Sequence, residues 1–136
     1  MYVLSYNVSW GAMSGNPQDS TVEALINKYC IKKKNICLKN VITAIDLETR
    51  EPFGFVCIQE SSNDLLYSGS KNLKKMSRIT TYDGLAQLNT CWDYLKFELM
   101  GYTFLSLKPG DGRPCHILFF RDCYNNLFII INLHNG

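Results

Sequence analysis

The sequence lacks a long hydrophobic run and lacks a large excess of charge of either sign. Its longest uninterrupted apolar segment, residues 127–131, is much shorter than the roughly 20 residues of a membrane-spanning helix. Its 14 basic and 12 acidic residues give a formal net charge of +2, which excludes a histone-like arm but permits a local basic patch. Residues 1–7 lack the basic start and apolar stretch of a signal peptide. We therefore expect an intracellular protein, cytoplasmic or nuclear, without a membrane span.

Length and composition predict one folded domain. The chain has 136 residues, of which 46% are apolar and 19% charged, which is typical of a globular protein rather than a disordered one. The six cysteines match no common zinc template, and disulfide frameworks belong mainly to small secreted domains. We expect a single domain over residues 1–136 with all six cysteines reduced.

The first half of the chain has the pattern of a β-α-β unit. Residues 2–8 predict a strand, and the capping box Ser20-x-x-Glu23 predicts the start of a helix. A second helix is expected over about residues 35–48. Residues 53–58 are continuously apolar, as in a central strand that is buried on both faces. A layered α/β architecture follows from this order.

The second half of the sequence predicts one more long helix and three strands. Apolar residues recur every three or four positions over 85–99, which favours a helix that Gly101 ends. Strands are expected over 102–107, 115–121 and 127–133. The polar segment 61–82 has room for a short helix and a strand.

Polar side chains follow three of the predicted strands. Asn7 ends the first strand, Glu60 follows the apolar strand, and Asn132 and His134 lie at the end of the last one. Because ligands of open α/β sheets bind at the carboxyl ends of strands, these side chains can converge. Glu60 would supply a hard oxygen ligand for Mg²⁺ or Mn²⁺, although a solvated glutamate that opens a loop has the same pattern.

Three short motifs, in order, resemble those of a known superfamily. Residues 5–8 (SYNV), 57–60 (CIQE) and 131–134 (INLH) resemble the T/S-x-N-V/I, L-Q-E and x-N-x-H motifs of the endonuclease/exonuclease/phosphatase superfamily, which has the deoxyribonuclease-I-like fold. The resemblance implies a layered α/β sandwich. This chain would form about one half of it, with a mixed sheet and helices on one face.

The resemblance implies a role for each motif residue. Glu60 would bind the catalytic Mg²⁺ or Mn²⁺, and Asn7 would help to place the ion and the phosphate. His134 would contact the scissile phosphate or protonate the leaving group, with Asn132 supporting the strand that carries it. Arg113 is a candidate phosphate clamp. The implied activity is that of a divalent-metal-dependent phosphodiesterase or nuclease, with nucleic acid as the substrate.

The sequence also departs from the family pattern. Family members are about twice as long, and their second half supplies a G-D-x-N and an S-D-H motif, neither of which is present here. The chain would then be a fragment, a half-domain that pairs with another chain or with itself, or a non-catalytic binding or assembly module. A phosphatase of the same superfamily, acting on inositol phosphates or lipids, is a further alternative. A half-domain would leave an apolar face exposed, so we expect a homo-oligomer or a missing C-terminal half.

Overall fold

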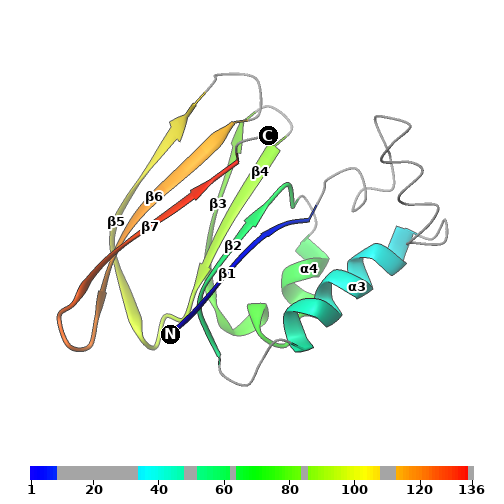
Figure 1. Cartoon of the computed structure of the whole chain (residues 1–136), viewed down its shortest axis with the longest axis horizontal. Coiled ribbons are helices and arrows are strands. Elements are labelled where there is room, and N and C mark those ends of the chain that lie inside the picture. Colours follow the sequence, from blue (N-terminus) through cyan, green and yellow to red (C-terminus); the bar gives the residue numbers. More distant parts are fainter. Residues whose placement is uncertain (9–33, 48–51, 62–63, 84–85, 108–112, 135–136) are drawn as a thin grey trace.

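Two β-sheets lie face to face in the computed structural model of the chain (Figure 1). It describes residues 1–8, 34–47, 52–61, 64–83, 86–107 and 113–134. The first sheet has the order β1-β2-β4-β3, with β1 (Tyr2–Asn7), β2 (Phe53–Gln59), β3 (Ser77–Asp83) and β4 (Ala86–Trp92). The second sheet has the order β5-β6-β7, with β5 (Phe97–Ser106), β6 (Pro114–Asp122) and β7 (Leu127–Leu133).

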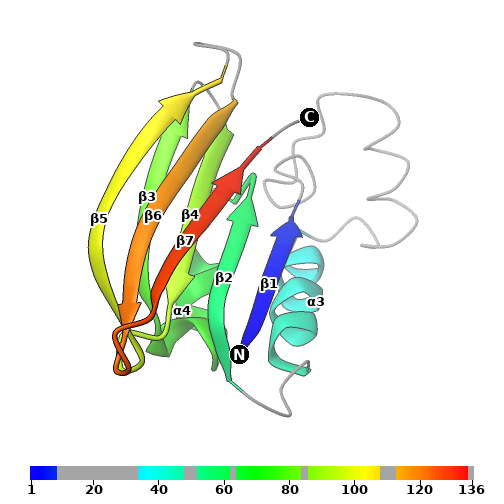
Figure 2. The same cartoon turned by 60° about the vertical axis from the view of Figure 1, so that its left-hand side comes forward.

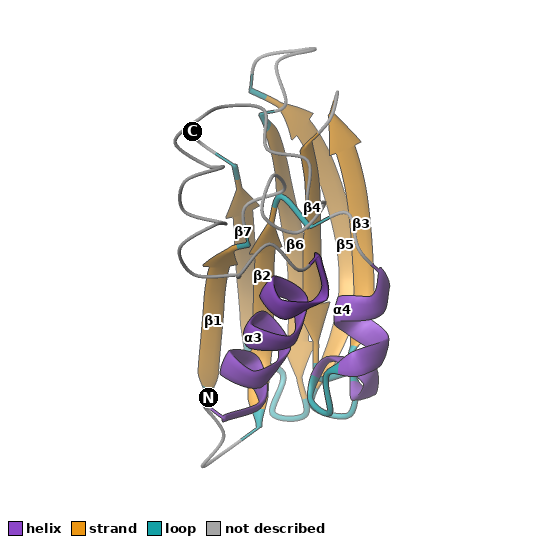
Figure 3. Cartoon of the chain, turned by 90° about the vertical axis from the view of Figure 1, so that its right-hand side faces the viewer, coloured by secondary structure: helices purple, strands orange, loops and turns teal. Residues whose placement is uncertain are grey.

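Helices cover the outer face of the first sheet (Figure 3). They are α3 (Lys34–Leu47), α4 (Asp64–Gly69) and the 3₁₀ turn η1 (Leu73–Lys75). The sheet is mixed, since β1 pairs with β2 in parallel whereas β4 is antiparallel to both β2 and β3. This confirms the predicted mixed sheet with helices on one face. The helix expected after Ser20 lies outside the described residues.

Strand β2 is buried along its whole length and connects two cores. Val56 and Ile58 face α3 and α4, where they pack with Val41 and Ile45. Phe55 faces the second sheet instead. A strand that buries both faces needs apolar side chains at consecutive positions, which is why the continuous run at 53–58 predicts it correctly.

The core between the sheets is largely aromatic. Phe55 lies at its centre, with ring centroids 4.5 Å from Phe97 and 4.9 Å from Phe120. Trp92 and Leu118 complete the buried cluster. These contacts join β2 and β4 to β5 and β6, so the two sheets form one packed unit.

The helix predicted over 85–99 is wrong. That segment forms β4 and the beginning of β5, with a turn between them in which the Asp93 carbonyl accepts hydrogen bonds from Lys96 N and Phe97 N. Leu95, counted as part of the apolar stripe, is 82% exposed at this turn. Because β4 is buried on both faces, its apolar residues lose the alternation of a surface strand and happen to recur at helical spacing. Gly101 lies in β5, beside a register shift, rather than at a helix end.

The outer face of the second sheet is apolar and exposed. Alternate residues of β7 are 43–78% exposed, and Phe119 of β6 beside them is 42% exposed. The exposed β7 residues are Leu127, Ile129, Ile131 and Leu133. Figure 2 shows β5, β6 and β7 in front of β3 and β4, and no helix of the described part of the chain covers them. An exposed apolar face of this kind was expected for a half-domain.

One of the cysteines that the structure describes differs from the prediction. Cys37 is disulfide-bonded, so the expectation of six reduced cysteines is wrong there. Cys57, Cys91, Cys115 and Cys123 are free. Burial raises the pKa of Cys57 to about 11 and that of Cys91 to about 12, so both thiols stay protonated near neutral pH and are poor nucleophiles.

None of the described helices is both long and apolar enough to cross a membrane.

Candidate functional site

Three strands bring their carboxyl ends to the same edge of the molecule (Figure 2). In the parallel pair, Asn7 of β1 lies opposite Gln59 of β2, which places Asn7 beside Glu60. Strand β7 of the other sheet ends at the same edge and leads into His134. The parallel pairing of β1 and β2 explains how residues 53 positions apart in the sequence meet.

Asn7, Glu60 and His134 meet at a single oxygen atom. Asn7 Nδ2 donates a hydrogen bond to Glu60 Oε1 over 2.9 Å, and His134 Nε2 lies 2.9 Å from the same oxygen. Because a carboxylate oxygen only accepts, the His134 contact requires a proton on Nε2. The Glu60 side chain is 27% exposed and the His134 side chain 10%. The cluster is therefore partly shielded but open to a ligand.

The backbone of Glu60 has a strained conformation. Its φ is +60°, in the left-handed region where a side chain other than glycine costs about 1–2 kcal/mol. Two backbone hydrogen bonds fix the chain there, from Glu60 N to Gln87 O (2.9 Å) and from Val8 N to Gln59 O (3.1 Å). Such strain concentrates at functional sites.

Glycine at position 60 is expected to give a more stable protein than alanine, by about 1 kcal/mol of unfolding free energy. Both variants lack the carboxylate, so the comparison isolates the left-handed backbone. At the exposed β5 position Thr103, the matched pair should show the opposite order, because glycine weakens a regular strand. Urea unfolding of the four variants measures both differences. If glycine and alanine rank in the same order of stability at both positions, the backbone of Glu60 is not strained.

A buried hydrogen-bond network ties the two sheets together beneath this cluster. Asn132, 1% exposed, accepts a hydrogen bond from Gln59 Nε2 over 2.7 Å. Its own Nδ2 donates to Asn89 O (2.9 Å) and to Thr90 Oγ1 (3.1 Å). Gln59 directly precedes Glu60, and Asn132 lies two residues before His134. The network therefore sets the positions of both residues.

His116 extends this network into the core. Its ring is fully buried, with Nδ1 2.9 Å from Thr90 Oγ1 and the ring of Phe104 at a centroid distance of 4.9 Å. Burial lowers the pKa of His116 to about 4, so the imidazole is neutral near pH 7. No local pattern indicates the roles of Thr90 and His116, and Gln59 enters the motif only as the neighbour of Glu60, since each of the three acts through partners on other strands.

The predicted site residues thus occupy three kinds of position. Asn7, Glu60 and His134 touch one another, whereas Asn132 lies buried below them. Arg113 precedes Pro114, whose carbonyl accepts a hydrogen bond from His134 N over 3.1 Å. No hydrogen bond or ion pair joins the Arg113 guanidinium to the cluster within the part of the chain that the structure describes.

Solved structures share this arrangement of strands and helices. The catalytic domain of human Nocturnin matches with a TM-score of 0.63 and 12% identity, over 98% of this chain and 50% of that chain. ANGEL2, a 2′,3′-cyclic phosphatase, matches with a TM-score of 0.60 and 17% identity, over 98% and 40%. An endonuclease/exonuclease/phosphatase family protein from Bacteroides thetaiotaomicron matches with a TM-score of 0.54 and 16% identity, over 97% and 49%.

The chain has the endonuclease/exonuclease/phosphatase fold. It spans about half the length of the solved structures that it matches, or less. No protein-family model matches the sequence, and no curated protein matches it. The family resemblance of the three motifs and the likeness of the fold agree, since the motif residues stand at the ends of strands that the fold aligns.

The oxygen donors of the cluster fit part of a divalent-ion site in an endonuclease/exonuclease/phosphatase fold. Glu60 offers a carboxylate, and Asn7 beside it offers an amide oxygen. Mg²⁺ typically uses one or two carboxylates and keeps several waters and substrate oxygens as its other ligands. No group of three or more His, Cys, Asp or Glu side chains that could hold a metal occurs among the described residues. Further ligands would therefore come from water, substrate or another segment.

Proposed function

We propose that this chain supplies part of the active site of a divalent-metal-dependent phosphodiesterase that acts on nucleic acid. That part is the cluster around Glu60. The observation that carries the proposal is the convergence of Asn7 and His134, each 2.9 Å away, on Glu60 Oε1. The fold, which is shared with the cyclic phosphatase ANGEL2 and with a family of nucleases and phosphatases, supports it. ANGEL2 has also been solved with adenosine-2′,3′-vanadate, a ligand that contains a nucleoside.

Each residue of the cluster has a part in this reaction. Glu60 and Asn7 would hold Mg²⁺ or Mn²⁺, which supplies stabilisation of the charge that develops on the phosphate oxygens. When protonated on both ring nitrogens, His134 would donate its Nε2 proton to a phosphate oxygen or to the leaving oxygen and remain as a neutral imidazole. Asn132 holds the strand that carries His134. Arg113, next to Pro114, would approach the phosphate from the β6 side.

A second segment would complete the site. Residues 1–136 would form a single incomplete domain, since neither G-D-x-N nor S-D-H occurs in the sequence. A missing general base lowers the rate by about 10²–10⁴. Strands β1 and β7 are terminal strands of their sheets, and a groove of about 400 Å³ runs between them, lined by residues that include Val3, Ser5 and Ile130. This groove and the apolar outer face of β7 suit a missing C-terminal half or a second copy of the chain.

Removal of divalent metal is expected to abolish hydrolysis. The assay follows cleavage of plasmid DNA, single-stranded DNA, RNA and a chromogenic phosphodiester in Mg²⁺ or Mn²⁺, then in excess EDTA, then with metal restored. We expect slow turnover that disappears with EDTA and returns with the ion, because the proposed reaction depends on the ion to stabilise the charge that develops on the phosphate oxygens. Turnover that EDTA leaves unchanged would contradict the proposal. Inositol phosphates and phospholipids in the same panel test the phosphatase alternative.

A non-catalytic assembly module is the second candidate. The observation that favours it is the exposed apolar face of β7, with side chains 43–78% exposed, since apolar patches of this kind mark interaction surfaces. This alternative predicts a stable oligomer and no turnover with any divalent ion. Size-exclusion chromatography with light scattering, run beside the hydrolysis assay, separates it from a slow monomeric enzyme.

A further inference from the structure

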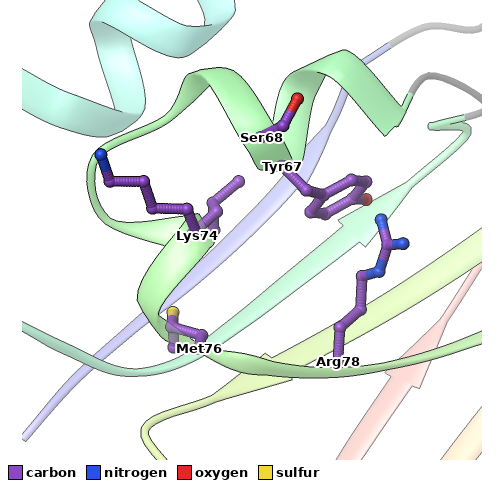
Figure 4. Close-up of a pocket in the computed structure, with 6 residues that line it drawn as sticks. Tyr67, Ser68, Lys74, Met76 and Arg78 are labelled. Carbon is purple, nitrogen blue, oxygen red and sulfur yellow. The ribbon is translucent and has the colours of Figure 1, made fainter.

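A pocket of about 280 Å³ opens between α4, η1 and β3, away from the Glu60 cluster (Figure 4). Its base is apolar, with Leu73 only 2% exposed and the ring of Tyr67 8% exposed. Lys74 and Arg78 line opposite sides of it, with the Lys74 ammonium extending away from Arg78, and the Ser68 hydroxyl lies above Tyr67 in this view. An apolar base with a cationic rim suits an anionic ligand.

Arg78 is held in place by a ring contact and by an ion pair at the protein surface. Its guanidinium carbon lies 4.0 Å from the centroid of the Tyr67 ring, and its Nη2 lies 3.1 Å from Asp64 Oδ1. The ring contact orients the plane of the guanidinium. The Asp64 side chain is 88% exposed, and an ion pair with so exposed a partner is weak and easily exchanged. The remaining N–H donors of the guanidinium can therefore bind a phosphate.

Basic residues outnumber acidic ones in the segments around this pocket. Lys74 and Arg78 line it, and Lys71 and Lys75 lie in the same turn region of the chain. The acidic residues bonded to these segments are Asp46 and Asp64. Asp46 already accepts hydrogen bonds from Ser70 Oγ (2.6 Å) and from two backbone N–H groups. These bonds help to hold the pKa of Asp46 below its usual value. Its carboxylate therefore serves the turn and not the pocket.

Strand β3 runs from the pocket towards the end of the sheet at which Glu60 lies. Arg78 lies opposite Cys91, and Cys91 lies opposite Val56, four residues before Glu60. Strand spacing and rise put Arg78 and Glu60 about 16 Å apart. Tyr82, on the same face of β3 as Arg78, pairs with Gln87, whose carbonyl accepts the hydrogen bond from Glu60 N. Tyr82 is 68% exposed, so a base can stack on its ring.

We propose that the pocket of Lys74 and Arg78 binds a backbone phosphate of a nucleic-acid strand whose scissile bond lies at Glu60. The inference rests on the proposed function and adds a second contact point for the strand. A stacked strand rises about 3.4 Å per nucleotide, so about five nucleotides separate the two points. Oligonucleotides shorter than this cannot occupy both.

Oligonucleotide binding tests the proposal separately from catalysis. Fluorescence anisotropy in EDTA compares single-stranded DNA of 4 and 12 nucleotides on the wild type, Lys74→Gln, Arg78→Gln and Lys96→Gln. Lys96, 54% exposed and paired with Asp93 in the turn between β4 and β5, is the matched control. We expect Lys74→Gln and Arg78→Gln each to weaken binding of the 12-mer about five- to tenfold and to lower its salt slope by about 0.7. The 4-mer cannot reach both points, so it should bind the wild type more weakly than the 12-mer does.

Three outcomes would overturn the proposal. The first is equal affinity of the Lys74→Gln and Lys96→Gln variants for the 12-mer. The second is equal affinity of the wild type for the 4-mer and the 12-mer. The third is displacement of the 12-mer by inorganic phosphate only at concentrations where chloride of equal ionic strength also displaces it. Lys74 is exposed, so its variant is expected to fold. Glu60→Gln should keep the Lys74-dependent binding of the 12-mer, and this result would stand even where no hydrolysis is found.

Discussion

Replacing Glu60 by glutamine is expected to lower divalent-ion-dependent phosphodiester hydrolysis by about three orders of magnitude. Glutamine keeps the size of the side chain and one oxygen acceptor, but it loses the negative charge that would hold the ion. A bound ion contributes several kcal/mol of charge stabilisation in the transition state, and about 4 kcal/mol corresponds to a factor of roughly 10³ in rate. Initial rates on the best substrate of the panel, at saturating Mn²⁺, measure the loss.

Glu98→Gln is the matched control for this substitution. Glu98 is 62% exposed and pairs with Arg121 across β5 and β6, outside the cluster. Its variant should keep the wild-type rate, since an exposed ion pair contributes at most about 1 kcal/mol to stability. Equal rates for Glu60→Gln and Glu98→Gln would remove Glu60 from the mechanism.

Acidification from pH 6.5 to pH 4 is expected to cost about 3 kcal/mol of unfolding free energy through His116 alone. Burial lowers the pKa of this imidazole from 6.5 to about 4 in the folded protein. Between these values the unfolded chain binds a proton that the folded chain does not, so stability falls as the pH falls. The contribution is fully present above pH 6.5 and is lost towards pH 4, at about 1.4 kcal/mol per pKa unit.

Urea unfolding at several pH values, on the wild type and on His116→Gln, isolates this contribution. Glutamine does not titrate and can still bond to Thr90 Oγ1, which lies 2.9 Å from the imidazole Nδ1. We expect the stability of the variant to depend less on pH between 6.5 and 4, although its stability at pH 7 is lower. Parallel curves for the two proteins would show that His116 does not carry the effect.

Local sequence patterns predict the helices that bury one stripe of apolar residues and the strands that bury one continuous apolar run. Helix α3 and strand β2 follow from such patterns, because their apolar residues face cores on the sides that the pattern indicates. Ligands bind at the carboxyl ends of strands in α/β sheets, and this rule also predicts that Asn7 and Glu60 belong to the same site. Their contact required only that β1 and β2 pair in parallel.

Features that depend on contacts between the sheets could not be predicted. The sequence of β4 predicts part of a helix because the strand is buried by α4 on one side and by the second sheet on the other. The bond from Gln59 to Asn132 joins residues 73 positions apart, and neither residue type indicates the other as a partner. The strained backbone of Glu60 likewise results from two hydrogen bonds to other strands.

Binding of Mn²⁺ to the 136-residue chain tests the role of Glu60 most directly. Electron paramagnetic resonance of free Mn²⁺, titrated with the wild type, Glu60→Gln and Glu98→Gln, reports the affinity without requiring turnover or a second segment. We predict one ion bound per wild-type chain, the same affinity for Glu98→Gln, and affinity at least about tenfold weaker for Glu60→Gln. Equal affinity of all three proteins would contradict a metal site at Glu60.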